Sequence, residues 1–212
     1  QTTSSLQIRH AMDTGKIIIV NLSKGKLGED TAGFLGSMLV TKFQIDAMSR
    51  ADVPETERRD FYLYVDEFQN FATDSFKTIL AEARKYRLDL SITNQYIKQL
   101  PEDVRDAVIG NVGTIVSFRV GAEDAEFLAK EFPNVTEQDL VNLPFANTYV
   151  KLLIDGTPTK PFSMQTIKTS VPHHKELAAA IRQLSRLKFG KDRRLVEQEM
   201  NSRGPDPRAF DT

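Results

Sequence analysis

Phe61-Tyr-Leu-Tyr-Val-Asp66-Glu67-Phe-Gln-Asn-Phe71 is the stretch of sequence that decides the fold. An apolar and aromatic run ends abruptly on two adjacent carboxylates, and an aromatic residue follows them. A short apolar run of this kind is typical of a buried strand. Because ligands bind outside the carboxyl ends of the strands in open α/β sheets, the two carboxylates predict a site at this point.

The segments on either side alternate between apolar runs and helical patterns. Further strands are predicted at 15–22, covered on both faces, at 88–93 and at 114–118. Helices are predicted from about Asp30 to Phe43, from a cap at Asp74 or Ser75 to Tyr86, at 102–110, at 122–131 and, as a short one, at 137–142. Residues 149–154 and 161–167, joined through Asp155-Gly156, predict a closing β-hairpin. This order predicts an α/β fold whose parallel sheet is covered by helices on both faces.

Residues 1–170 are predicted to form one domain, and residues 171–212 a basic helical tail. In the tail, Leu177, Ile181, Leu184 and Leu187 form a narrow apolar stripe, and basic residues outnumber acidic ones. The stripe predicts a helix that docks on the domain or on a neighbour; the alternative is a basic arm on nucleic acid or an acidic membrane surface. The last ten residues, which contain Pro205 and Pro207, are expected to be disordered.

Composition limits the classes of protein that remain. The chain has 212 residues and a net charge of −1, so no global basic field indicates a DNA-coating protein. It has no cysteine, which excludes thiolate zinc sites and disulfides. No apolar run approaches the roughly 20 residues that span a bilayer, and any membrane anchor is expected upstream of Gln1. His10, His173 and His174 are predicted to be surface residues.

Polar residues follow the predicted strands: Asp66-Glu67, Asn94-Gln95, Arg119 and, more loosely, Asn21 and Ser23. They suit the hydrolysis of a nucleoside triphosphate such as ATP, which needs phosphate charge neutralised, a positioned water and a base. Asp66 suits Mg²⁺, because hard cations take oxygen ligands. Glu67 suits a general base, and Gln95, with its donor and acceptor, suits a γ-phosphate sensor.

These stretches resemble a known family. The segment from Gly15 to about Phe132 resembles the C-terminal half of the HerA/FtsK-type P-loop ATPases, and within them it is most similar to the TraG/TraD-type coupling proteins of conjugation and type IV secretion. The matching stretches are Val65-Asp66-Glu67-Phe68, Ala83-Arg84-Lys85, Thr93-Asn-Gln95, Ser117-Phe-Arg119-Val120 and Glu123-Asp124-Ala125. The resemblance implies a RecA-like fold with ATP and Mg²⁺ as cofactors.

The resemblance also implies roles for single residues. Asp66 and Glu67 match the Walker B pair, and Gln95 matches the sensor glutamine. Arg84 falls where the family carries the arginine that reaches a neighbouring subunit, and Arg119 is a second basic candidate for nucleotide binding. The family often has glycine where Ala83 and Arg87 stand, so Arg87 remains an alternative to Arg84. Either arginine could instead be a helix-face partner of Glu82 or Asp89.

One family element is missing from these 212 residues. No Gly-x-x-x-x-Gly-Lys-[Ser/Thr] phosphate loop is present, and Lys24-Gly-Lys-Leu-Gly28 resembles one only in composition. We therefore expect a fragment that lacks the first strand and the phosphate loop of a RecA-like domain, holds the hydrolytic half of the site and does not hydrolyse ATP alone.

The resemblance implies an ATP-driven DNA translocase. We expect a homohexamer that moves DNA through its central channel, with secretion-apparatus and relaxase proteins as further partners. The chain is expected to be its cytoplasmic portion, anchored to the inner membrane by an upstream segment. Two alternatives remain at this point: a soluble HerA-like DNA-processing translocase, and a non-hydrolysing assembly or DNA-docking partner without a phosphate loop.

Overall fold

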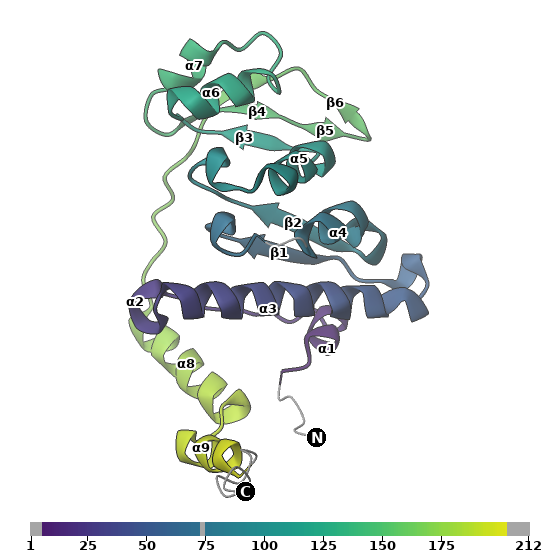
Figure 1. Ribbon diagram of the computed structural model, residues 1–212, viewed down its shortest axis with the longest axis vertical. Coiled ribbons are helices and arrows are strands. Elements are labelled where there is room, and N and C mark those ends of the chain that lie inside the picture. The colour runs from purple at the N-terminus through teal and green to yellow at the C-terminus, as the bar shows by residue number, and fades with distance from the viewer. Residues whose placement is uncertain (1–5, 73–74, 203–212) are drawn as a thin grey trace, which may run out of the picture. The chain divides into compact units, whose positions relative to one another are not determined.

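The computed structural model describes residues 6–72 and 75–202 (Figure 1). The chain divides into two units: Ile8–Lys168 is the larger, and Gln1–Gln7 with Thr169–Thr212 forms the smaller. The predicted boundary between a domain ending at residue 170 and a tail beginning at 171 stays a prediction. Asp74 and the last ten residues lie outside the described residues, and so do the predictions made for them.

The larger unit alternates helices with strands along most of its length. In chain order its elements are α1 (Ile8–Asp13), α2 (Lys24–Leu27), α3 (Glu29–Met48), η1 (Ser49–Asp52), η2 (Glu55–Glu57), β1 (Phe61–Val65), η3 (Phe68–Asn70), α4 (Ser75–Glu82), η4 (Ala83–Tyr86), β2 (Leu88–Ile92), η5 (Ile97–Gln99), α5 (Glu102–Asn111), β3 (Ile115–Ser117), α6 (Ala122–Ala129), α7 (Glu137–Val141), β4 (Asn147–Lys151), β5 (Leu153–Ile154), β6 (Thr157–Pro158) and β7 (Phe162–Gln165). The α/β class predicted from the sequence is confirmed.

The strands form separate sheets. β1 and β2 pair in parallel, with Phe61 opposite Leu88 and Val65 opposite Ile92. β3, β4 and β7 form an antiparallel sheet in the order β3-β4-β7, and the short β5 and β6 pair with each other. The predicted closing hairpin is therefore present. β3 pairs with β4 rather than with β2, so the parallel part of the fold is the β1–β2 pair.

The predicted strand at 15–22 is wrong for this structure. Residues 16–23 have no regular secondary structure, and the side chains of Ile17 and Ile19 are 90% and 88% exposed. A strand needs a neighbour to satisfy its backbone N–H and C=O groups, and β1 has a hydrogen-bonded neighbour only in β2. Among the described residues, segment 16–23 pairs with no strand, so its apolar pattern alone does not make it one.

The antiparallel half of the larger unit has its own core. Ala125 and Leu128 of α6 pack with Phe132 and with Leu140 of α7, and all four are at most 3% exposed. Partly buried side chains from β3 and β4, among them Ile115 and Tyr149, pack against this cluster. Burial of large apolar side chains is the dominant stabilising contribution to folding, so this half is held together by its own residues.

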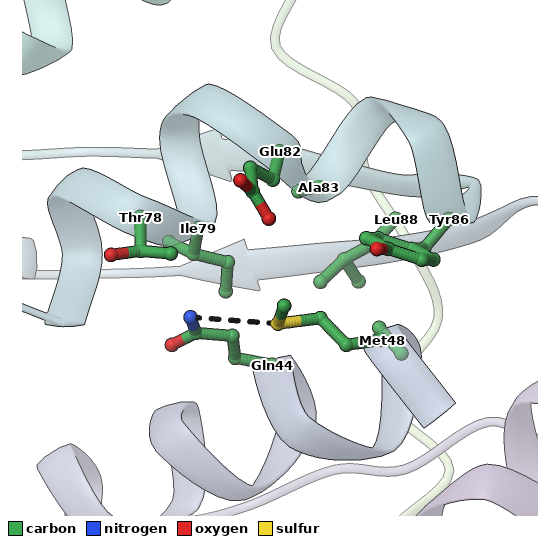
Figure 2. A pocket seen from close by; sticks show the side chains of 9 residues that line it. Gln44, Met48, Thr78, Ile79, Glu82, Ala83, Tyr86 and Leu88 are labelled. Carbon is green, nitrogen blue, oxygen red and sulfur yellow. Dashed lines mark hydrogen bonds between the residues drawn. The ribbon is translucent and has the colours of Figure 1, made fainter. Parts of the chain in front are cut away.

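The parallel half rests on α3. Figure 2 shows Gln44 and Met48 of α3 facing Thr78, Ile79 and Glu82 of α4. The space between them is about 10 Å³, too small for a nucleotide. The buried face of α3 is lined by Ala32, Gly36, Val40, Phe43 and Ala47, whereas Phe34 and Met38 on the same helix are exposed. Small residues on this face allow close packing: a Cβ on Gly36 would lie 2.2 Å from the Phe71 ring.

Arg50 joins several segments at the amino ends of β1 and β2. Its buried side chain donates to the Tyr86 carbonyl at 3.0 Å and to the Arg59 carbonyl at 2.5 Å, and its Nε lies 3.1 Å from Asp13 Oδ1. Burial lowers the pKa of Arg50, and the Asp13 carboxylate opposes that shift. The guanidinium therefore holds η4 and the entry to β1 by charge-assisted hydrogen bonds and α1 by an ion pair.

In the described part of the smaller unit lie the helices α8 (Lys175–Phe189) and α9 (Arg193–Asn201). The stripe predicted on α8 is present, and its members Leu177, Ile181, Leu184 and Leu187 are exposed. Across the residues that the structure describes, no helix is both long and apolar enough to cross a membrane. His10, His173 and His174 are exposed, as predicted.

Candidate active site

The carboxyl ends of β1 and β2 lie side by side. The parallel pairing continues past the strands, because the Thr93 amide donates to the Val65 carbonyl at 3.0 Å and the Phe68 amide to the Thr93 carbonyl at 2.8 Å. Phe68 is fully buried and fixes the turn that follows β1. The residues after both strands are thereby brought to one edge of the sheet, as the sequence predicted.

Glu67 occupies a backbone conformation that is rare for a residue with a side chain. Its φ of 51° and ψ of 47° are left-handed, which costs about 1–2 kcal/mol for such residues. This conformation turns the chain out of β1 into η3. Gln95 Nε2 donates to Glu67 Oε1 at 2.8 Å, so two of the predicted catalytic residues are in direct contact. Backbone strain at a half-buried carboxylate is typical of functional sites.

Asp66 is held from two sides. Its Oδ1 accepts from the Thr93 hydroxyl at 2.6 Å and from the Glu67 amide at 3.0 Å. Oδ2 accepts no hydrogen bond from the residues that the structure describes, and the side chain is exposed. Thr93 was not predicted as a site residue, although its place between β2 and Gln95 puts it opposite Asp66. Asp66 thus has one anchored oxygen and one available oxygen.

A second chain of contacts, which the sequence did not reveal, reaches Glu67 from the other side. Asn70 Nδ2 donates to Glu67 Oε2 at 3.2 Å, and Lys24 Nζ lies 3.0 Å from Asn70 Oδ1. Lys24 also forms an ion pair with Glu29 at 2.6 Å, and this contact lowers the pKa of Glu29. The three-residue spacing of Glu67 and Asn70 is the one signal that the sequence offered for part of this arrangement.

Asp124 positions the loop that follows Gln95. It is 5% exposed, and its carboxylate oxygens accept from the amides of Ile97 and Lys98 at 3.2 and 3.3 Å. A buried carboxylate that accepts backbone hydrogen bonds is a strong structural anchor. Although Glu123-Asp124-Ala125 was one of the matching stretches, no role was predicted for Asp124. Asp124 therefore links η5, and with it the segment that follows Gln95, to α6.

A groove of about 700 Å³ adjoins the two carboxylates. It runs between segment 18–25, α3 and the open edge of β1, and Asp66, Glu67 and Asn70 line it together with Ser23 and Lys24. Its volume is in the range of small-molecule sites. Apolar side chains, including Val40 and Phe43, line the part that runs along α3. The polar chemistry is therefore concentrated where the groove meets the ends of segment 18–25 and β1.

The predicted arginines do not join this cluster. Arg84 is exposed on η4, before the start of β2, whereas Gln95 follows the end of β2. The intervening five-residue strand is roughly 16 Å long, since a strand rises about 3.3 Å per residue. Arg87 lies at the same amino end and pairs with Asp60 at 3.3 Å, not with Glu82 or Asp89. Arg119 is exposed and follows β3, which belongs to the antiparallel sheet β3-β4-β7.

The oxygen atoms at the carboxyl ends of β1 and β2 fit a Mg²⁺ ion that is bound through a single protein carboxylate. Magnesium keeps several waters and takes one or two carboxylates together with substrate phosphates. The available oxygen of Asp66 suits that role. Across the described residues no group of three or more histidine, cysteine, aspartate or glutamate side chains could form a complete protein cage for a metal. The remaining ligands would have to come from water and phosphate.

One comparison with known protein families gives a match in the part of the chain that contains the candidate site. Residues 60–140 match the family model described as the TraM recognition site of TraD and TraG. This span contains both carboxylates, Gln95, the three candidate arginines and Asp124. No curated protein sequence matches the chain.

The fold is similar to that of solved structures of a conjugative coupling protein, TrwB. The unbound monoclinic form of the bacterial conjugative coupling protein TrwBdeltaN70 matches with a TM-score of 0.64 and 15% identity, over 77% of this chain and 44% of that one. TrwB in complex with ADP and Mg²⁺ matches with a TM-score of 0.55 and 16% identity, over 69% and 40%. TrwB in complex with the ATP analogue ADPNP matches with a TM-score of 0.51 and 18% identity, over 66% and 38%. The chain thus spans less than half the length of these structures. Together the matches confirm the resemblance predicted from the sequence: residues 60–140 are similar to the corresponding segment of TraD and TraG, and the chain has the fold of the coupling protein TrwB.

Proposed function

We propose that this chain supplies the hydrolytic half of an ATPase site in a conjugative coupling protein. The observation that supports this most is the contact between Gln95 Nε2 and Glu67 Oε1, 2.8 Å long, at the carboxyl end of a parallel strand pair. A base and a sensor on adjacent strands can address the same phosphate. The similar protein TrwB has been crystallised with ADP and Mg²⁺ and with ATP and GTP analogues.

Each residue has a distinct role in this proposal. Glu67 accepts the proton of the attacking water as general base. Gln95 exchanges its contact with Glu67 for the γ-phosphate or the attacking water when nucleotide binds. Asp66, anchored by Thr93, would hold Mg²⁺ through its second oxygen, and the bound ion would supply charge neutralisation to the β- and γ-phosphates. Thr93 and Asp124 keep the two loops in register.

The phosphate loop is proposed to come from another part of a longer protein, since these 212 residues contain none. We further propose a homohexameric ring in which Arg84 serves the nucleotide of the neighbouring subunit. Its place at the amino end of β2 is too far from its own site for contact, and an arginine supplied in trans needs that separation. Arg119 follows β3 and remains a candidate for nucleotide contact within the subunit.

The partners follow from the family description. A segment described as the TraM recognition site of TraD and TraG suggests that residues 60–140 dock a TraM-like relaxosome protein. We propose DNA as the translocated substrate and an inner-membrane anchor elsewhere in the protein, with this chain on the cytoplasmic side. Secretion-apparatus and relaxase proteins would complete the assembly.

The test is the full-length protein with Glu67→Gln, compared with Glu126→Gln as a matched control. Glu126 is an exposed carboxylate on α6, away from the strand ends. Glu67→Gln should lower ATP turnover by roughly 10²-fold or more and leave nucleotide binding intact, because only the base is lost. Glu126→Gln should turn over ATP like wild type. Wild-type turnover by Glu67→Gln would exclude this mechanism.

A further inference from the structure

We infer that Asn70 is a positioning residue for Glu67, and that Lys24 sets the orientation of the Asn70 amide. The inference rests on the proposed function of Glu67 as base. It concerns two residues outside the Asp-Glu pair and the sensor glutamine, one in η3 and one in α2. The contacts form a chain from Lys24 through Asn70 to Glu67.

The hydrogen-bonding capacity of the three side chains allows only one direction for this chain. A lysine ammonium can only donate, so the atom of Asn70 that faces Lys24, 3.0 Å away, must be the oxygen. The amide NH₂ of Asn70 is then left to face Glu67 Oε2 at 3.2 Å, and an ionised carboxylate can only accept. Without Lys24 the side-chain amide of Asn70 could rotate by half a turn. Its oxygen would then face the Glu67 carboxylate, and the two would repel each other.

Both oxygens of the Glu67 carboxylate thus accept a hydrogen bond from a side-chain amide, one after β2 and one after β1. Gln95 donates to Oε1 and Asn70 to Oε2. If Gln95 leaves Glu67 to address phosphate, Asn70 becomes the remaining side-chain contact that holds the base. A base that is free to rotate loses alignment with its water, and misplacement by about 1 Å can lower a rate by on the order of 10²-fold.

Lys24 has a second contact besides Asn70. Its ion pair with Glu29 at 2.6 Å joins it to the first turn of α3, so the ammonium is held from two sides. Lys24 is exposed and Asn70 is half-buried, which leaves Lys24 accessible to substitution without a change in the core. Lys26, two residues further on α2, is also exposed and makes no ion pair among the described residues.

The experiment uses the full-length protein and steady-state ATP hydrolysis. Asn70→Asp keeps the shape of the side chain but replaces the donor with a second carboxylate. It should lower kcat by roughly 10- to 100-fold with little change in KM, because the base is misaligned while nucleotide contacts persist. Lys24→Met should lower kcat in the same direction by a smaller factor, and the control Lys26→Met should match wild type.

A double-mutant cycle separates positioning from a structural role. In a Glu67→Gln background, single-turnover measurements should show no further loss from Asn70→Asp, because the side chain acts through the carboxylate. An equal loss in both backgrounds, or a rise in KM that accounts for the effect, would overturn the inference. A low rate for Glu67→Gln together with a wild-type kcat for both Asn70→Asp and Lys24→Met would overturn this inference. The proposed function of Glu67 would still stand. Wild-type turnover by Glu67→Gln would instead remove the proposed function, and the inference with it.

Discussion

The two ends of the β1–β2 pair differ in the chemistry that they present. At the carboxyl end, Asp66 and Glu67 meet neutral donors: the hydroxyl of Thr93 and the amides of Gln95 and Asn70. At the amino end the functional groups are guanidinium groups, contributed by Arg50, Arg58, Arg59, Arg84 and Arg87. One end thus presents two carboxylates with neutral donors around them, and the other presents several guanidinium groups, two of which pair with Asp13 and Asp60.

The arginines of the amino end are not equivalent. Arg50 donates to two carbonyls, and Arg58 donates to the carbonyls of Arg50, Val53 and Lys85 and lies over the Tyr86 ring. Arg87 pairs with Asp60. Arg84 is exposed, and its side chain makes no hydrogen bond or ion pair with any residue that the structure describes. The comparison therefore favours Arg84 over Arg87 as the arginine available to a neighbouring subunit.

The largest expected effect is that of Arg84→Ala in the full-length protein. ATP turnover of the assembled ring should fall on the order of 10³-fold, because the transition-state charge loses its guanidinium. Nucleotide affinity of isolated subunits, measured by titration with a fluorescent analogue, should be unchanged. A larger loss from Arg87→Ala than from Arg84→Ala would reverse the assignment of the two arginines.

Arg50→Met should be mainly a stability defect. The substitution leaves the Tyr86 and Arg59 carbonyls without their buried donor and removes one of the two guanidinium groups that pair with Asp13. We expect a loss of about 3 kcal/mol in the free energy of unfolding, measured by urea denaturation of the full-length protein. At a temperature where the variant is folded, turnover per folded subunit should stay close to wild type. A specific loss of turnover would place Arg50 in the catalytic machinery.

The smallest effect is expected from Arg87→Ala. The ion pair with Asp60 is solvent-exposed, with side chains 42% and 46% accessible, and such pairs contribute about 0.2–1 kcal/mol. Thermal unfolding should shift by a few degrees or less, and 0.5 M salt should reduce the difference from wild type, because salt screens an exposed pair. ATP turnover should change less than twofold.

Much of the fold could be predicted because β1 and β3 are short, mainly apolar runs and β2 alternates apolar with polar residues, and both patterns identify strands directly. Segment 15–22 shows the limit of that signal. Its apolar pattern is as strong as that of β1, but strand formation also depends on a hydrogen-bonding neighbour, which a local pattern cannot specify. The same limit applies to β3, whose antiparallel partner β4 lies more than 30 residues further along the chain.

Part of the candidate site could also be predicted, because parallel strands bring their carboxyl ends to one edge. That rule alone placed Gln95 beside Glu67. The contacts of Lys24 with Asn70 depend on where α2 and the loop before it settle, and no spacing in the sequence encodes that. Whether Arg84 or Arg87 has a local partner depends on how the loop before β1 packs against the start of β2, where Asp60 pairs with Arg87.

The central claim is that opposite ends of the same strand pair serve two different subunits. Mixing Arg84→Ala with Glu67→Gln full-length subunits tests it directly, since a mixed ring contains interfaces at which an intact Arg84 faces an intact Glu67. Each variant alone should be nearly inactive, and the mixture should recover part of the wild-type ATP hydrolysis with a maximum near equal amounts. No recovery at any ratio, with ring assembly confirmed by light scattering, would contradict the claim.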